Sequence, residues 1–439
     1  MLLRKYFKAS AFVAALASGS NAQAQAEPSH LPLPSAEIPA AALERSPAPM
    51  ELALAPVAAP GTPAKKHWYE LLRLRGYTQL RYNRLPSFDE NDALINSQGD
   101  RSIGGGNGFL LRRARLIIQG DVHEHVFVYL QPDFASTIGE QLHVAILRDW
   151  YADVSLDKKK EFRFRVGQSK VPFGFENMQS SSNRIALDRN DALNSTFRDE
   201  RDLGVFFYWA PEEIRKRLKH LVDSGLKGSG DYGVFAFGVF NGQGANRPER
   251  NDNLHTVGRL AYPFLFGKQF IELGVGGYVG KYTVSLAQPT GGKAITSTEP
   301  DNTYKDWRAA GSLIVYPQPF GFQAEWNFGE GPALGRNQTT IIRDRPLHGG
   351  YAQLMYKINT SDGQTIIPFS RGTYYEGGKK FEANAPRYSI RELETGIEWQ
   401  PYSAIELTLA YTISSRTSDK YPYTKQDGQL TRVQLQFNY

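Results

Sequence analysis

Cysteine is absent from the 439-residue chain, so neither a disulfide framework nor a metal site built from thiolates is available to it. A strong charge of either sign is absent as well. The formal net charge is +6, and three of the cations, Arg4, Lys5 and Lys8, belong to the first eight residues. A balance this small does not indicate a nucleic-acid partner. Aromatic residues at 12%, together with 41 glycines, instead suit a protein with many strands and turns.

A long hydrophobic run is also missing. The apolar stretch from Ala9 to Ala17 is about half the length of the roughly 20 residues that a membrane-spanning helix needs. It is followed by Ala22-Gln23-Ala24 and Ala24-Gln25-Ala26, and either fits a signal-peptide cleavage site. We therefore predict a signal peptide over residues 1–26 rather than a membrane anchor. No later stretch reaches spanning length, so membrane insertion would have to use strands, because only helices and closed barrels satisfy their backbone polar groups in lipid.

Residues 27–67 are rich in proline and alanine and lack the periodicity of a core-forming segment. This composition predicts a disordered periplasmic leader. A periplasmic tether is the alternative function for the same segment.

The final residues, 429–439, alternate between apolar and polar side chains. Apolar Val433 and Leu435 fall on one face, since successive side chains of a strand point to opposite sides. Polar Arg432 and Gln434 fall on the other. A terminal strand of this kind is typical of an outer-membrane barrel whose last strand closes against its first, and a soluble all-β protein is the alternative.

The same period of two recurs along the whole chain from residue 72. It predicts sixteen strands, near residues 72–83, 109–119, 122–134, 143–156, 161–169, 203–209, 231–240, 254–263, 270–281, 307–316, 320–328, 350–358, 364–375, 390–400, 404–414 and 429–439. We therefore predict an all-β fold, a transmembrane antiparallel β-barrel of about 16 strands that occupies residues 68–439.

The connections between these strands support the same fold. Long extracellular segments are expected after residues 82, 134, 169, 240, 281, 328, 375 and 414, and short periplasmic turns lie between them. One link on the periplasmic side, residues 210–230, is long, and it contains Glu212 to Leu218, which we predict to be a short amphipathic helix.

Short motifs now add a resemblance. They are Phe109-Leu110-Leu111-Arg112-Arg113-Ala114-Arg115, Gln131-Pro132-Asp133-Phe134, Arg148-Asp149-Trp150-Tyr151-Ala152-Asp153, Arg165-Val166-Gly167-Gln168-Ser169-Lys170-Val171-Pro172-Phe173, Arg201-Asp202-Leu203-Gly204-Val205 and Phe240-Asn241-Gly242-Gln243-Gly244. In this order they resemble the phosphate-selective porin O/P family of Gram-negative outer membranes, over residues 68–439. The resemblance implies a 16-stranded, homotrimeric outer-membrane channel that passes anions, with phosphate the substrate of its best-understood members.

The expected anion-binding site consists of cations on the polar faces of the strands. Arginine has a permanent charge and a fork of donors that matches phosphate oxygens. The segment 169–202 adds further cations, and it lies where the constriction loop of a porin would fold into the lumen. The predicted pore-lining cations are Arg73, Arg75, Arg81, Arg113, Arg115, Arg163, Arg165, Lys170, Arg184 and Arg198. The alternative is that they line the lumen or its rim without conferring selectivity.

Acidic residues favour a second interpretation. The strands toward the C-terminus place several carboxylates on the apparent inner face: Glu325, Glu392, Glu394, Glu398 and Glu406. The segment 169–202 is itself balanced in charge. A cationic wall opposite an acidic one is typical of general diffusion porins, so a channel for small polar solutes with little anion selectivity is the alternative function.

The expected function is passive diffusion of small anions, phosphate or polyphosphate among them, across the bacterial outer membrane. Neither a Gly-x-Ser-x-Gly elbow nor a P-loop is present, so we expect no enzyme activity. His123-Glu124-His125 has metal-like spacing but no third ligand, so we expect a solvated turn, no metal and no cofactor. The expected partners are outer-membrane lipid, small anions, further copies in a homotrimer and the barrel-assembly machinery, which would recognise the strand ending at Tyr439.

Overall fold

The computed structural model describes residues 67–85, 94, 108–138, 141–196, 201–288, 294–335, 340–419 and 424–439. The predicted signal peptide, nearly all of the predicted leader and Arg198 lie outside these residues. Within the described ranges, no helix combines the length and apolar character needed to cross a membrane.

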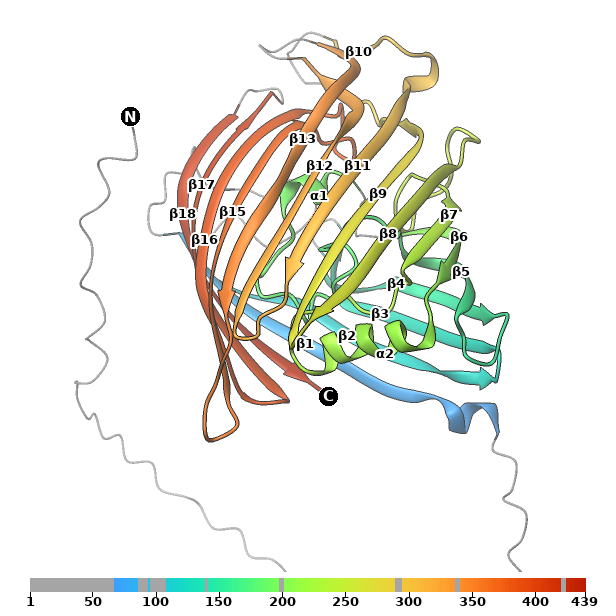
Figure 1. Ribbon diagram of the computed structural model, residues 1–439. Coiled ribbons are helices and arrows are strands. Elements are labelled where there is room, and N and C mark those ends of the chain that lie inside the picture. Colours follow the sequence, from blue (N-terminus) through green and yellow to red (C-terminus); the bar gives the residue numbers. More distant parts are fainter. Residues whose placement is uncertain are drawn as a thin grey trace, which may run out of the picture. The chain divides into compact units, whose positions relative to one another are not determined.

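Antiparallel strands make up most of the described chain (Figure 1). They are β1 (Arg73–Arg84), β2 (Gly108–His123), β3 (Val126–Ile138), β4 (Gln141–Ser155), β5 (Phe162–Lys170), β6 (Arg201–Trp209), β7 (Phe235–Phe240), β8 (His255–Phe266), β9 (Gln269–Thr283), β10 (Thr296–Ser297), β11 (Thr303–Val315), β12 (Phe320–Leu334), β13 (Ile341–Tyr356), β14 (Ile358–Asn359), β15 (Thr365–Gly378), β16 (Arg387–Tyr402), β17 (Ile405–Ser418) and β18 (Thr424–Asn438). The helices are α1 (Asp191–Asn194) and α2 (Glu212–Asp223), with the 3-10 turns η1 (Trp68–Leu71) and η3 (Pro300–Asn302).

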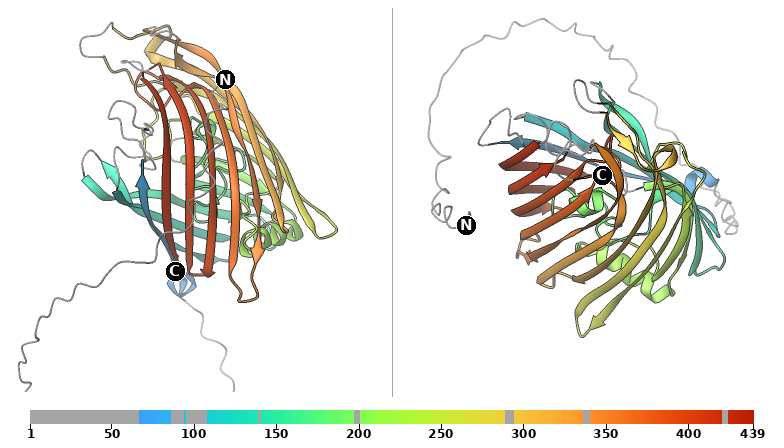
Figure 2. Two further views of the ribbon diagram at one scale, coloured as in Figure 1. Left: turned by 90° about the vertical axis from the view of Figure 1, so that its left-hand side faces the viewer. Right: turned by 90° about the horizontal axis from the view of Figure 1, so that it is seen from above.

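The sheet closes on itself. Each long strand pairs with the next along the chain, and β18 pairs with β1 from Tyr77 opposite Asn438 to Arg84 opposite Thr431. The two-residue strands β10 and β14 add to the edges of β13 and β15, so sixteen strands form the closed wall. Figure 2 shows the same ring of strands from two further directions. The predicted 16-stranded antiparallel barrel is confirmed.

The two faces of the wall differ as lipid outside and water inside require. Trp150 on β4 is 62% exposed on the outside, whereas the adjacent Asp149 faces inward and is 4% exposed. On β1, Leu74 is 69% exposed and Arg81 is fully buried. The predicted division of β1 into an apolar outer face and a polar inner face is therefore confirmed.

Strand ends differ from the sequence prediction on the long-loop side. β3 continues to Ile138 and β12 to Leu334, so the connections expected after residues 134 and 328 are shorter than predicted. The alternation stops before these strands end: residues 331–334 of β12 are all buried, and Leu334 packs in a cluster with Tyr304 and Ile342. An alternation pattern therefore detects only the part of a strand whose two faces differ.

The predicted amphipathic helix is confirmed and is longer than predicted. α2 buries Ile214, Leu218 and Leu221, which lie at helical spacing on one face. These side chains pack in one cluster with Phe175 from the β5–β6 connection and Ile314 from β11. The helix is therefore anchored to the barrel, at the end that carries the short turns (Figure 1).

Candidate functional site

One carboxylate inside the barrel is surrounded by four guanidinium groups. Asp188 lies in the β5–β6 connection, and its Oδ2 is 2.7 Å from Arg81 Nη1 on β1 and 2.7 Å from Arg432 Nη1 on β18. Its Oδ1 is 3.1 Å from Arg112 Nη2 and 4.0 Å from Arg113 Nη2, both on β2. We call these five residues the Asp188 cluster. It lies where the barrel closes, because β18, β1 and β2 are neighbours in the wall.

A β-bulge supplies the second arginine of β2. Gln79 on β1 is opposite Arg113, but Leu80 is opposite Leu111, so the register shifts by one residue and Arg112 is the extra residue of the bulge. A bulge re-aims one side chain relative to strict alternation. Two consecutive arginines therefore reach the same carboxylate, although a period of two would assign Arg112 to the lipid face.

Further ion pairs extend from this cluster. Arg371 on β15 reaches Glu176 Oε1 at 2.9 Å and Glu394 Oε2 at 3.2 Å, and Arg432 lies 3.2 Å from the same oxygen of Glu394. Glu176, like Asp188, belongs to residues 171–196, whereas Glu394 is on β16. Within the part of the chain that the structure describes, the connected ion-pair set thus holds five guanidiniums and three carboxylates.

Asp191, the first residue of α1, forms a separate pair of contacts. Its Oδ1 is 2.8 Å from Lys379 Nζ, and its Oδ2 is 3.4 Å from Arg416 Nη2 on β17. Arg416 also reaches Glu392 on β16 at 2.7 Å. A second carboxylate of residues 171–196 is therefore paired with cations of the β15–β17 side of the barrel.

Backbone hydrogen bonds to a carboxyl group hold the same segment on another side. Glu325 on β12 accepts the backbone N–H groups of Phe175 and Glu176 at 2.7 and 2.9 Å. Gly174 makes this approach possible: its φ is +71°, and a Cβ there would lie 2.4 Å from Glu325 Oε1. Residues 171–196 thus contact inward-facing side chains of strands that are far apart around the barrel.

Arg308 on β11 binds the end of the segment. Its Nη1 donates to Ser195 Oγ and Thr196 Oγ1, each at 2.7 Å, and its Nη2 donates to the Ser195 carbonyl at 2.8 Å. Within the described part of the chain, its hydrogen-bond partners are all neutral. The guanidinium therefore brings positive charge to the interior without a carboxylate in direct contact.

The predicted cations of β5 are paired along the wall. Arg165 makes two hydrogen bonds to Asp153 on β4, at 2.7 and 2.9 Å, and its guanidinium lies 3.8 Å from the Tyr151 ring centre. Arg163 binds Asp231, in the α2–β7 connection, at 2.8 Å. Burial alone would raise the pKa of Asp231, but the cations of Arg163 and Arg215 outweigh burial and lower the pKa.

Arg115 on β2 contacts both the barrel wall and Ser181 of residues 171–196. Its Nε lies 2.8 Å from Asp133 Oδ2, and its Nη1 donates to Tyr77 Oη at 2.8 Å and to Ser181 Oγ at 3.0 Å. Arg115, which was predicted to line the pore, therefore forms an ion pair with the wall and a hydrogen bond with residues 171–196.

The remaining predicted cations are distributed differently. Arg73 and Arg75 face the inner side of β1 but are exposed near its beginning, away from the Asp188 cluster. Lys170 Nζ donates to the carbonyl groups of Met178 and Gln179, at 3.1 and 2.5 Å. Arg184 is buried within the segment. The predicted Arg198 lies outside the described residues.

Several functional side chains were missed in the sequence. Arg308, Arg371 and Arg432 occupy inward positions of predicted strands, so the alternation alone could have identified them. Arg416 lies beyond residue 414, where its strand was predicted to end, because β17 continues to Ser418. Arg112 could not be identified in this way, because the bulge that re-aims it is a property of the pairing and not of the pattern.

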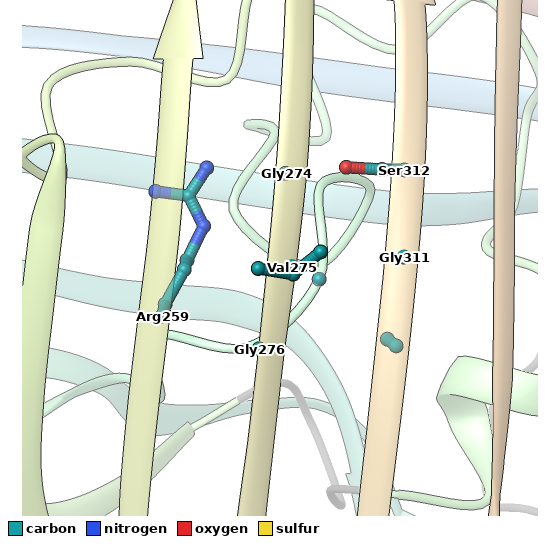
Figure 3. A pocket seen from close by; sticks show the side chains of 8 residues that line it. Arg259, Gly274, Val275, Gly276, Gly311 and Ser312 are labelled. Atoms are coloured by element: carbon teal, nitrogen blue, oxygen red, sulfur yellow. The ribbon is translucent and has the colours of Figure 1, made fainter.

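A small hollow in the wall offers little for binding. It is lined by Gly174, Arg259, Gly274, Val275, Gly276, Ala310, Gly311 and Ser312 and has no room for a water molecule. Figure 3 shows the Arg259 side chain lying along the wall beside the bare backbone of Gly274 and Gly276. The Arg259 guanidinium is 3.3 Å from Glu272 Oε1, so the charged group of the lining is already paired. We interpret the hollow as a packing feature.

Metal ligation finds no support in the described ranges, where no group of three or more His, Asp or Glu side chains could hold an ion. His123 and His125 lie at the β2–β3 turn, and His125 Nδ1 is within 2.8 Å of the Ser155 carbonyl.

Comparison with known families identifies the barrel. Residues 91–439 match the family model described as phosphate-selective porin O and P. The chain belongs to this porin family. It is therefore a channel-forming protein of the bacterial outer membrane and not an enzyme.

Solved porins share the fold of this family member at low sequence identity. The outer membrane channel DcaP of Acinetobacter baumannii is 11% identical, with a TM-score of 0.52, and the match covers 84% of this chain and 97% of that one. OmpF of Salmonella typhi is 11% identical, with a TM-score of 0.53 and the same coverage of both chains. No match was found among curated proteins.

Proposed function

We propose that this porin passes small anions by passive diffusion and that oxyanions of the phosphate class are its preferred solutes. The observation that carries the proposal is that, among the described residues, the ion pairs around Asp188 join five guanidiniums to three carboxylates. A surplus of fixed positive charge in a low-dielectric wall raises the local concentration of anions. Guanidinium groups also match the geometry of phosphate oxygens.

Residues 171–196 form the constriction in this proposal. Their contacts with β1, β11, β12, β15 and β18 support it, since only a segment inside the ring can contact inward-facing side chains from so many strands. The segment would narrow the path and hold the Asp188 carboxylate among the arginines. Partial neutralisation keeps each site weak enough for an anion to leave, as conduction requires.

A general diffusion porin remains the second candidate, and a specific observation favours it. Arg115, Arg163 and Arg165 are each paired with a carboxylate, so the charge of each is at least partly offset, although Asp133 is shared with Arg148 and Asp231 with Arg215. The inward carboxylates of β16 and β17 add an acidic wall. Under this alternative, anions and cations would permeate about equally.

Reversal potentials across planar bilayers under a KCl gradient distinguish the two functions. We expect the protein to favour chloride, and we expect the double variant Arg112→Gln/Arg113→Gln to lose much of that preference. Arg391→Gln is the matched control, because Arg391 is an exposed residue of β16 outside the cluster. A barrel that does not discriminate between the two ions, or a double variant that matches the control, would reject the proposal.

The oxyanion class and the assembly state need their own measurements. Phosphate and pyrophosphate titrated into chloride should reduce the chloride current at low concentration if the arginines bind oxyanions, whereas nitrate should not. We also propose a homotrimer, inserted by the barrel-assembly machinery through the strand ending at Tyr439. Mass determination in detergent tests the trimer, and insertion assays with Tyr439→Ala test that role of the terminal residue.

A further inference from the structure

A single lysine enters the barrel interior from the short-turn end. Lys227 belongs to the connection between α2 and β7 and is 1% exposed. Its Nζ is 2.6 Å from Glu398 Oε1 on β16 and 3.9 Å from Glu406 Oε2 on β17. We call these three residues the Lys227 cluster. It holds one ammonium and two carboxylates, a charge ratio opposite to that of the Asp188 cluster.

The two glutamates face the interior of the barrel. Their strands expose Ile397, Trp399 and Leu409 on the outside, by 41 to 46% of their surface, whereas Glu398 is fully buried. Gln400 donates to Glu398 Oε1 at 2.7 Å and to Glu406 Oε2 at 3.3 Å. The other oxygen of Glu398, Oε2, is buried and makes no hydrogen bond among the described residues.

Without Lys227, this part of the wall would attract cations. Two neighbouring carboxylates, one with an unused oxygen, provide ligands that hard cations prefer. The next cation, Lys357, is directed elsewhere, because its Nζ donates to the Ser224 carbonyl at 2.6 Å. Lys227 is therefore the described group that offsets the charge of Glu398 and Glu406.

Lys227 also has an unusual backbone conformation. Its φ is +65°, a left-handed conformation that disfavours residues other than glycine and asparagine, so a substitution at this position has to tolerate that backbone. Burial lowers the pKa of Lys227, but Glu398 and Glu406 outweigh burial and raise the pKa above its ordinary value, so the group is charged at neutral pH.

The same residue also contacts the proposed constriction. The Lys227 carbonyl accepts a hydrogen bond from Gln179 Nε2 at 2.5 Å, and the neighbouring Gly228 carbonyl accepts one from Asn183 Nδ2 at 2.6 Å. The α2–β7 connection and residues 171–196 thus meet inside the barrel. A charge at Lys227 therefore lies close to the path that the constriction defines.

We propose that Lys227 is a selectivity-determining residue, which cancels a cation-attracting pair of glutamates on the inner wall of an anion-preferring channel. The inference rests on the proposed function, but its test has a separate outcome. Selectivity at this level of the barrel then depends on a periplasmic connection and not on the wall alone.

Three variants test the inference by reversal potential. Lys227→Asn removes the charge and tolerates the left-handed backbone, and Lys227→Arg keeps the charge. We expect Lys227→Asn to lower the anion-to-cation permeability ratio by roughly threefold or more, since fixed charge in a low-dielectric wall changes local ion concentrations strongly. Lys227→Arg should stay close to the parent protein. Adding Glu398→Gln and Glu406→Gln to Lys227→Asn should restore the parent ratio.

Block of the current by magnesium distinguishes an electrostatic role of Lys227 from a structural one, because a purely structural role would not change it. Mg²⁺ added on the periplasmic side should reduce the current through Lys227→Asn and leave the parent and the triple variant unaffected. The double variant Glu398→Gln/Glu406→Gln, which keeps Lys227, should increase the anion preference, and it tests the inference even if Lys227→Asn does not fold. Barrel formation is checked by the shift in gel mobility on heating.

The outcomes separate the two proposals. A parent protein without anion preference would reject the proposed function, while a shift toward cations in Lys227→Asn would still support the role of the lysine. A folded Lys227→Asn with the parent ratio, a triple variant that behaves like the single one, or a double glutamate variant without a change would overturn the inference.

Discussion

The Asp188 cluster and the Lys227 cluster lie in one barrel and are built in opposite ways. In the first, wall strands supply four guanidiniums, and residues 171–196 supply one carboxylate. In the second, wall strands supply two carboxylates, and the α2–β7 connection supplies one ammonium. Buried like charges are costly to desolvate and repel one another. In both clusters, a segment outside the wall therefore carries the charge that the wall lacks.

The comparison shows that the net charge remaining after pairing matters more for selectivity than the number of cations. Among the described residues, the Asp188 cluster keeps a positive surplus, whereas in the Lys227 cluster one ammonium faces two carboxyl groups. Arg165 adds an arginine to the interior but no surplus, because Asp153 is its partner, and Arg163 shares Asp231 with Arg215. Substitutions in the two clusters should thus change selectivity in ways that a count of arginines does not predict.

Removing the shared carboxylate should have the largest effect. Asp188→Asn leaves four guanidiniums without their common partner, and breaking a buried ion pair on one side costs about 3–5 kcal/mol. We expect the guanidinium chloride midpoint of unfolding in detergent, followed by tryptophan fluorescence, to fall markedly. The control is Asp362→Asn, in the exposed turn before β15. An equal midpoint for both variants would contradict the central role of Asp188.

Arg308 offers a contrast to both clusters, since its described hydrogen-bond partners are neutral. Arg308→Gln should lower the free energy of unfolding by about 2 kcal/mol, the range for hydrogen bonds made by a charged group. It should also increase current noise, because the bonds to Ser195 and Thr196 hold the end of residues 171–196. Arg308→Lys keeps the charge but loses the fork. If that variant were as quiet and as stable as the parent, the hydrogen bonds would not be what holds the segment.

The wall was predictable from the sequence, for a physical reason. Lipid on one side and water on the other impose a period of two on every strand, so Leu74 and Arg81 could be assigned to opposite faces before any contact was known. The extension of β12 was missed because its residues 331–334 are all buried and do not alternate. Arg112 was missed because a bulge depends on how two strands pair.

Pairing inside the barrel was not predictable either. The sequence showed that the segment after β5 is balanced in charge and that Glu398 and Glu406 face inward. It did not show that Asp188 joins arginines of three strands, or that Lys227 reaches the glutamates from a connection that was predicted only to contain a helix. Such contacts depend on how loops fold into the ring, and residue spacing carries no information about that.

Removing one of the four guanidiniums should matter less than removing the carboxylate. Arg432→Gln leaves Asp188 with Arg81, Arg112 and Arg113, so we expect a loss of about 1 kcal/mol, within the range for a hydrogen bond. The surplus of positive charge falls by one, so the anion-to-cation permeability ratio should fall modestly. Both changes are measured beside Asp188→Asn. A larger loss of stability in Arg432→Gln than in Asp188→Asn would reverse the order that the geometry predicts.

Lys380 extends the comparison to a third connection and should give the smallest effect. It lies between β15 and β16 and binds Asp306 on β11, as Lys227 binds Glu398. Burial lowers the pKa of Lys380 to about 8, because the negative charge of Asp306, which raises the pKa, offsets only part of the effect of burial. Lys227, with two carboxylates, keeps its proton, so raising the pH from neutral to about 9 should neutralise Lys380 alone.

The expected result is a small loss of anion preference as the pH passes about 8, absent in Lys380→Met. The free energy of unfolding should instead rise over the same pH range. Because folded Lys380 binds its proton less tightly than the unfolded chain does, its contribution to the free energy of unfolding rises with pH above that pKa. His255, Tyr278 and Arg308 lie around the same carboxylate and are unchanged in the variant. A step of equal size in Lys380→Met would show that Lys380 is not the group that titrates.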